Sequence, residues 1–174
     1  VYYGSAEDKQ AGLDRIPLIE KIIGKTSLKR DCWFQRGGGM VELKKFGLTN
    51  YNYATDDEIK VLVGKEGTEG AFMSVGSSKG NGFSGECVFN IYCPKGTKGM
   101  YVEPFSQFGN GAKSSDWDGV CNQKTVGGEN ETLLQRGTKF RVTKVEKSGG
   151  KWYIDMEVIE QKPVAFPYVG DYPF

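Results

Sequence analysis

Histidine is absent from the 174 residues of this chain. Its absence excludes mechanisms in which an imidazole activates a Ser or Cys nucleophile, and it removes the imidazole ligands that many zinc sites use. Any catalysis must rely on carboxylate, Arg, Lys, Tyr, Ser or Cys side chains. Cysteine is scarce and lacks the C-x-x-C spacing of a metal site, so we expect reduced, buried thiols and no metal centre. The four cysteines are Cys32, Cys87, Cys93 and Cys121.

Long apolar runs and an excess of one charge are also missing. No segment approaches the ~20 apolar residues that a transmembrane helix needs, and no charged-then-apolar leader opens the chain. The 23 Lys and Arg residues nearly balance the 22 Asp and Glu residues. This balance provides no general electrostatic attraction to nucleic acid or to an anionic membrane. We therefore expect a soluble protein without a nucleic-acid partner.

The length of the chain is typical of a single domain, and helical patterns are confined to its first third. Residues 13–24 carry apolar side chains at helical spacing, with Pro17 suited to begin the second part of that helix. A second helix is predicted within residues 54–64, where Thr55 and Glu58 have the spacing of a capping box. We divide the domain into a helical lead-in (1–30), a core (31–160) and a C-terminal tail (161–174).

Strand patterns dominate the rest, so the sequence predicts an α+β fold that is mostly β. In the first predicted strand, alternation places Arg36 on the same face as apolar Cys32 and Phe34. The last two predicted strands form a hairpin through Gly149-Gly150, with Trp152, Ile154, Met156 and Val158 on its inner face. The predicted strands cover residues 29–39, 71–78, 86–94, 131–145 and 151–160.

Two glutamates, Glu129 and Glu131, open one of these strands in the stretch GGENETLLQRGTKFRV. Side chains two apart on a strand share a face, so the pair is either a solvated surface or a working pair. The stretch before it, residues 108–128, has loop composition and a length of ~20 residues, which is uncommon for an idle connection. By contrast, Asp155 and Glu157 lie mid-hairpin and have the pattern of an ordinary solvated face.

Three segments now follow in order: WFQRG, FMSVG and ENETLLQRGTKFRV. This order resembles the Arg-Ser-Glu class of mono-ADP-ribosyltransferases, a toxin-like exoenzyme family that uses NAD as a co-substrate. The resemblance covers residues 30–160. It implies two packed antiparallel sheets that form an NAD cleft, with short helices on the N-terminal side.

The resemblance assigns the NAD contacts to the first two segments. It implies that Arg36 grips the NAD pyrophosphate, which suits the fixed fork of guanidinium donors, and that Gly37 offers main-chain groups to the nicotinamide amide. The alternative for Arg36 is an ion pair with a carboxylate at a strand end. Ser74 corresponds to the first position of the family's Ser-Thr-Ser strand, where the hydroxyl holds the catalytic Glu. Here Val75 and Gly76 depart from that pattern, and the alternative is a strand serine bonded to a neighbour.

The resemblance also divides the two glutamates. Glu131 becomes the catalytic residue, a fixed anion that stabilises the oxocarbenium charge as the N-glycosidic bond of NAD breaks. Glu129 becomes the group that orients and deprotonates an acceptor guanidinium. Phe83 is the candidate that packs on nicotinamide, and Trp117 the candidate that reads the target protein. The alternative for each aromatic residue is simple packing of its own loop.

The implied function is transfer of ADP-ribose from NAD to a target protein, with arginine as the expected acceptor. We expect a monomeric toxin or effector that is secreted or delivered into a target cell, with a neutralising protein as a further partner. One alternative is an NAD glycohydrolase that uses the same site. Another is a catalytically silent binding or virion-structural domain, which the altered Ser-Val-Gly segment favours.

Overall fold

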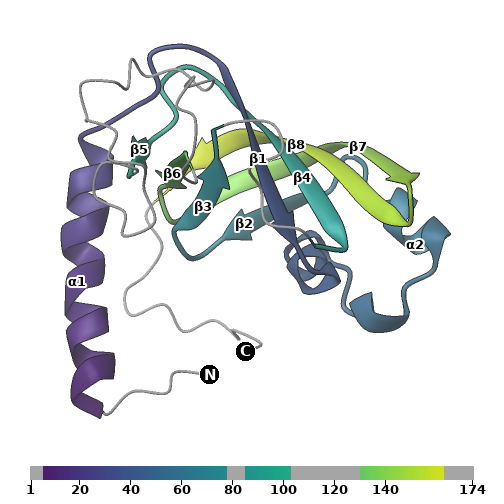
Figure 1. Cartoon of the computed structure of the whole chain (residues 1–174), viewed down its shortest axis with the longest axis horizontal. Helices are drawn as coiled ribbons and strands as arrows, with labels where there is room; N and C mark the ends of the chain where they lie inside the picture. The colour runs from purple at the N-terminus through teal and green to yellow at the C-terminus, as the bar shows by residue number, and fades with distance from the viewer. Residues whose placement is uncertain (1–5, 78–84, 103–129, 163–174) are drawn as a thin grey trace.

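Eight strands in a single mixed sheet form the body of the protein in the computed structural model, which describes residues 6–77, 85–102 and 130–162 (Figure 1). The described helical elements are α1 (Ala6–Gly24), η1 (Met40–Phe46), η2 (Tyr51–Tyr53) and α2 (Asp56–Lys60). The strands are β1 (Cys32–Gly38), β2 (Glu66–Glu69), β3 (Met73–Gly76), β4 (Cys87–Cys93), β5 (Gly99–Tyr101), β6 (Glu131–Leu134), β7 (Thr138–Ser148) and β8 (Lys151–Gln161).

The strands run in the order β2-β7-β8-β4-β1-β3-β6-β5. The α+β, mostly β fold class is therefore correct, but the expectation of two antiparallel sheets is wrong in two respects. β4 and β8 pair in parallel, and β1 and β3 join the two expected sheets into one. The joint is narrow, because β1 pairs with β4 along its whole length but with β3 only at Gln35 and Gly76. Alternation predicts strands but carries no information about which edges pair.

Alternating burial on the central strands builds the core. β4 alternates buried and half-buried residues along its length, and the predicted inner face of β8 is buried from Trp152 to Val158. Cys32, Cys87 and Cys93 are free and buried, as predicted, whereas Cys121 lies outside the described residues. Burial, with smaller contributions from Glu86 and Glu42, raises the pKa of the Cys87 thiol to about 12.

The helices flank this sheet at different places. α1 lies beside the β5–β6 edge, where the Thr26 hydroxyl donates to the Gly99 carbonyl at 2.6 Å and Gln135 Nε2 donates to the Glu20 carbonyl at 2.9 Å (Figure 1). It runs through Pro17 as one helix, with no break between the two parts that the sequence suggested. The predicted capping box of α2 is present, with Thr55 and Glu58 bonded reciprocally.

Several short elements were not predicted from the sequence patterns. The predicted strand 131–145 divides into β6 and β7 at a turn where Gly137 has φ +75°. β2 (Glu66–Glu69) has no apolar alternation, and β5 (Gly99–Tyr101) has only three residues, so neither produces a strand pattern. The 3₁₀ helix η1 was also missed, although its Leu43 and Phe46 are buried in the core.

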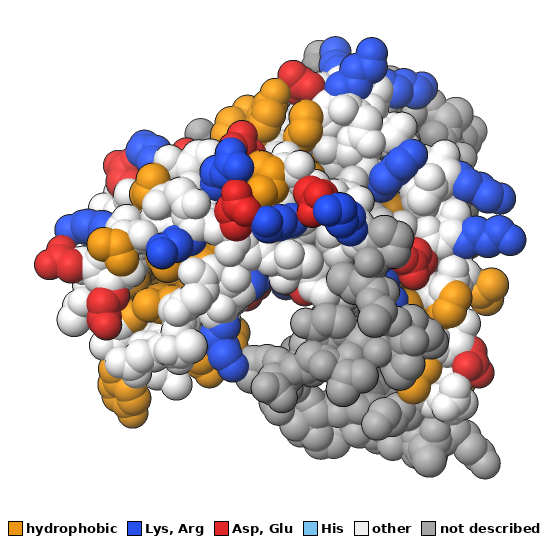
Figure 2. Space-filling model, turned by 180° about the vertical axis from the view of Figure 1, so that it is seen from behind, with side chains coloured by type: hydrophobic (Ala, Val, Ile, Leu, Met, Phe, Trp, Pro, Cys, Tyr) orange, Lys and Arg blue, Asp and Glu red, His pale blue; other side chains and the backbone are white. Residues whose placement is uncertain are grey.

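Basic side chains are spread over several parts of the face shown in Figure 2, with acidic side chains between many of them. This mixture matches the formal net charge of +1. Within the described residues, no helix is both long enough and apolar enough to cross a membrane.

Candidate functional site

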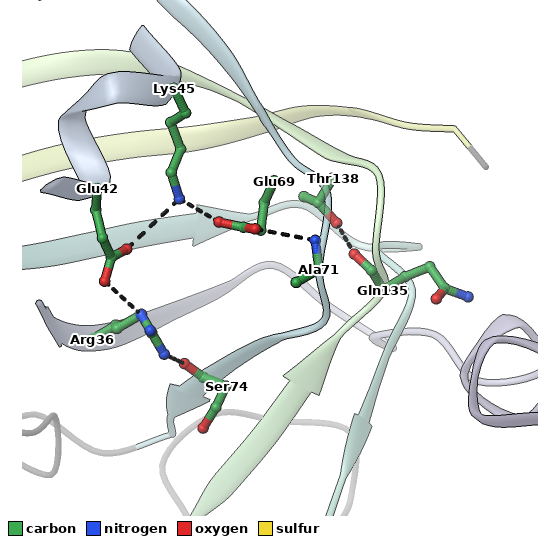
Figure 3. A network of polar contacts seen from close by, with 8 residues as sticks. All are labelled: Arg36, Glu42, Lys45, Glu69, Ala71, Ser74, Gln135 and Thr138. Carbon is green, nitrogen blue, oxygen red and sulfur yellow. Dashed lines mark hydrogen bonds and ion pairs between the residues drawn. The ribbon is translucent and has the colours of Figure 1, made fainter. Parts of the chain in front are cut away.

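Arg36 lies near the end of β1, on the face that alternation predicted. Cys32 and Phe34 are buried there, whereas 32 % of the Arg36 side chain is exposed. Arg36 Nη1 donates to the Ser74 carbonyl at 2.9 Å, and Nε donates to Glu42 Oε1 at 3.3 Å (Figure 3). The guanidinium thus bridges from β1 to β3 and η1 while part of it stays open to solvent. The ion pair with a carboxylate, given above as an alternative, is present together with this open edge.

The glycines that follow Arg36 allow close approach to β1. A Cβ on Gly38 would lie 2.3 Å from Glu42 Oε1, so a larger residue there would displace the carboxylate that holds Arg36. Gly85 approaches Gly38 so closely that its Cβ would meet the Gly38 carbonyl at 2.2 Å. Gly37, the candidate for main-chain contacts, lies between Arg36 and Gly38 on β1, in register with Val88 of β4. The backbone around Arg36 is therefore kept free of side chains by steric necessity.

Ser74 meets Arg36 through its main chain rather than its side chain. In the register of β3 with β6, Ser74 lies opposite Leu133, and Gly76 lies opposite Glu131. Ser74 and Glu131 share a face of the sheet but are one pleat apart. No hydrogen bond joins the Ser74 hydroxyl to Glu131 in the structure. The resemblance implies that the Ser74 hydroxyl holds the catalytic Glu, whereas the contact in the structure is between the Ser74 carbonyl and Arg36.

Glu131 is the first residue of β6, and the residue before it has an unusual backbone conformation. Asn130 has φ +48° and is the one non-glycine residue with positive φ in the described part of the chain. Its side chain is buried, and its Oδ1 accepts a hydrogen bond from the Tyr101 hydroxyl at 3.3 Å. Its carbonyl accepts from the Ser77 amide at 2.9 Å. Asn is among the few residues that adopt this conformation readily, and strained backbone of this kind is frequent at functional sites.

This conformation limits what alternation can say about the glutamate pair. The strand begins at Glu131, so the rule that side chains two apart share a face does not reach back through Asn130 to Glu129. Glu129 itself lies outside the described residues, as do the two aromatic candidates Phe83 and Trp117. Their predicted roles remain predictions.

A second pair of residues near Glu131 was missed from the sequence. The hydroxyls of Ser77 and Thr132 are 3.0 Å apart and buried on the opposite face from Glu131. This bond ties the end of β3 to the start of β6. Ser77 falls in a run of loop composition, and Thr132 appeared only as part of a strand, so neither carried a signal. Asn130 had one weak signal, its type, since Asn is enriched where φ is positive.

The motif segments therefore lie on neighbouring strands, because β1, β3 and β6 are consecutive in the sheet. A scan against protein families matches residues 4–161 to the ADP-ribosyltransferase exoenzyme family. The chain belongs to this family. The family resemblance inferred from the order of Arg36, Ser74 and Glu131 is thus confirmed, whereas the individual roles of these residues are not tested by it.

Solved ADP-ribosyltransferases share the fold. The toxin Plx2a of Paenibacillus larvae is 20% identical, with a TM-score of 0.61 over 91% of this chain and 74% of that one. C3stau2 of S. aureus, solved with NAD, is 18% identical, with a TM-score of 0.59 over 84% and 70% of the two chains. The C. perfringens toxin BECa, solved with NADH, is 18% identical, with a TM-score of 0.57 over 91% and 37%. No curated protein sequence matches this chain.

The candidate site is thus built from two kinds of contact. On the β1 side, Arg36 is ion-paired with Glu42, and on the β6 side, neutral hydrogen bonds join Tyr101 to Asn130 and Ser77 to Thr132. Within the described residues, no group of three or more His, Cys, Asp and Glu side chains lies close enough together to hold a metal ion.

Proposed function

We propose that this ADP-ribosyltransferase transfers ADP-ribose from NAD to an arginine of a target protein and releases nicotinamide. The observation that carries the proposal is the strand order β1-β3-β6, which brings three segments from distant parts of the sequence side by side. Arg36, Ser74 and Glu131 lie on these strands, and no sequence spacing required that arrangement.

Arg36 supplies the phosphate contact. Its Nε and Nη1 are engaged by Glu42 and the Ser74 carbonyl, and about one third of the side chain is exposed. A guanidinium held in this way presents its remaining donors in a fixed direction, which suits the paired oxygens of a pyrophosphate. Gly37, next to Arg36 on β1, is proposed to offer its main-chain groups to the nicotinamide amide.

Glu131 acts on the bond that breaks. The bond between the ribose C1′ and the nicotinamide nitrogen cleaves, the electron pair leaves with nicotinamide, and positive charge develops on the ribose. A carboxylate at this point stabilises the charge as it develops. Nicotinamide is already cationic in NAD, so its departure needs no strong general acid, which agrees with a chain that has no histidine.

Glu129 is assigned to the acceptor. A guanidinium nitrogen of the target forms the new bond to C1′, and the proton it loses passes to the Glu129 carboxylate. Phe83 is proposed to pack on nicotinamide, and Trp117 to contact the target protein. Secretion or delivery into a target cell, and neutralisation by a partner protein, belong to the same proposal as expectations for a toxin-type enzyme.

Labelled NAD incubated with the purified protein and a cell lysate tests the proposal. Label on a protein band, with mass spectrometry locating ADP-ribose on arginine, supports it. Label on another residue type retains transfer but overturns the choice of acceptor. Free ADP-ribose alone indicates a glycohydrolase, and intact NAD indicates the silent domain that the Ser-Val-Gly segment suggested.

A further inference from the structure

Four charged side chains of alternating sign form a row of ion pairs that ends at Arg36 (Figure 3). Arg36 Nε lies 3.3 Å from Glu42 Oε1, Glu42 Oε2 lies 3.6 Å from Lys45 Nζ, and Lys45 Nζ lies 2.5 Å from Glu69 Oε2. The four side chains come from β1, η1 and β2, so the row of ion pairs links three elements. Glu69 Oε1 accepts a hydrogen bond from the Ala71 amide at 3.1 Å, which connects this row of ion pairs to the backbone just before β3.

The three supporting side chains are more enclosed than the one they support. Glu42, Lys45 and Glu69 are 17%, 12% and 18% exposed, whereas Arg36 is 32% exposed. Pairs in such partly buried positions are screened less than surface pairs. The Arg36 guanidinium is therefore the most exposed member of the row, and the three side chains that hold it are more buried.

The absence of a side chain at Gly38 allows Glu42 to occupy the position that contacts Arg36. The Glu42 carboxylate lies over Gly38 at a distance that no Cβ would allow. Glu42 Oε1 and the Ser74 carbonyl together engage two of the three guanidinium nitrogens. Within the described part of the chain, Arg36 Nη2 has no recorded partner. The guanidinium is thus held on one side and presented on the other.

We propose that Glu42, supported by Lys45 and Glu69, is a positioning residue that aims Arg36 at the pyrophosphate of NAD. This inference rests on the proposed function and adds to it a residue outside the three motifs. Glu42 brings a negative charge close to an anion site, and by Coulomb's law alone that charge weakens anion binding. Its benefit is orientation, because it removes the rotational freedom that a long Arg side chain would otherwise lose when the ligand binds.

The two effects of Glu42 have opposite signs, which makes the substitution Glu42→Gln decisive. We expect Glu42→Gln to weaken binding of inorganic pyrophosphate and to raise the KM for NAD by about 10-fold, with a much smaller change in kcat. Glu66→Gln is the matched control, since Glu66 is also ion-paired but contacts Lys139 and Arg141 instead. The control should leave both quantities unchanged. Tighter pyrophosphate binding by Glu42→Gln would overturn the proposal, because charge alone would then explain the effect.

A double-mutant cycle shows whether Glu42 acts through Arg36. In an Arg36→Met background, Glu42→Gln should have little further effect, because the guanidinium that Glu42 contacts is already removed. Effects that add in full would overturn the proposal. The ¹⁵N resonance of Arg36 Nε gives an independent readout, since it should shift in Glu42→Gln and stay in place in Glu66→Gln.

The pyrophosphate measurement separates this inference from the proposed reaction. If the wild-type protein binds pyrophosphate through Arg36 but leaves NAD intact, the reaction is wrong, while the sign of the Glu42→Gln effect still supports or overturns the positioning role. If the wild-type protein binds no pyrophosphate, the positioning role is overturned as well.

Discussion

The surroundings of Arg36 and of Glu131 differ in their chemistry. Arg36 is held by the carboxylate of Glu42 within a row of ion pairs of alternating sign. The start of β6 is held by neutral groups, with the Tyr101 hydroxyl on the Asn130 side chain and the Ser77 hydroxyl on Thr132. A guanidinium is always charged and needs a counter-charge to stay in place when partly enclosed. The two hydroxyl bonds at the start of β6 instead involve neutral groups on both sides.

The largest effect is expected on the β6 side, at the reacting bond itself. Glu131→Gln keeps the shape of the side chain but removes the charge that stabilises the oxocarbenium ion. We expect kcat for both transfer and NAD hydrolysis to fall by about 1000-fold. Unchanged thermal unfolding would show that the fold is intact. Near-normal activity of this variant would remove Glu131 from the catalytic role.

The neighbouring glutamate should separate transfer from hydrolysis. Glu129→Gln is expected to lose transfer to arginine, because the acceptor is no longer deprotonated, while slow NAD hydrolysis continues. Both products can be followed with the same labelled NAD. Equal loss of the two activities would contradict a separate role for Glu129 and would place both glutamates on the bond-breaking step.

Substitution of Asn130, directly before Glu131, would perturb the start of β6 without removing a charged side chain. Asn130→Val forces a β-branched residue to φ +48° and removes the bond to Tyr101, so we expect a loss of about 2 kcal/mol in unfolding free energy and a fall in kcat. Asn130→Gly keeps the conformation accessible and should retain more of both. The measurements are thermal unfolding and kcat. Equal behaviour of the two variants would show that φ at this position is unimportant.

The smallest effect should come from loss of the neutral bond between Tyr101 and Asn130. Tyr101→Phe removes the hydroxyl that donates to Asn130 and should lower the unfolding free energy by about 1 kcal/mol. The KM for NAD should stay constant, in contrast to Glu42→Gln, because Tyr101 lies on the side of the site away from Arg36. A rise in KM in Tyr101→Phe would mean that the two sides of the site are coupled.

Local patterns predicted much of this fold. The Thr55–Glu58 capping box, the Gly149-Gly150 hairpin and the buried face of β8 all follow from short-range rules, and all are present. The edge strands β2 and β5 could not be predicted, since their residues show no alternation and pairing alone makes them strands. The single mixed sheet could not be predicted for a related reason, because one residue pair, Gln35 with Gly76, joins its two halves.

The candidate site divides in the same way. Arg36 and Glu131 could be found because residue type and order carry the family resemblance. Glu42 could not, since a glutamate six residues after an arginine in the sequence has no signature, and only the turn of η1 over Gly38 brings the two together.

The sequence by itself determined the residue types that any chemistry here must use, the α+β class and the family, because composition, alternation and motif order are local properties. Only the tertiary structure decided which strands are neighbours, that Arg36 donates to the Ser74 carbonyl, and that Asn130 has a positive φ directly before Glu131. These outcomes depend on contacts between residues far apart in the chain, which no short window of sequence contains.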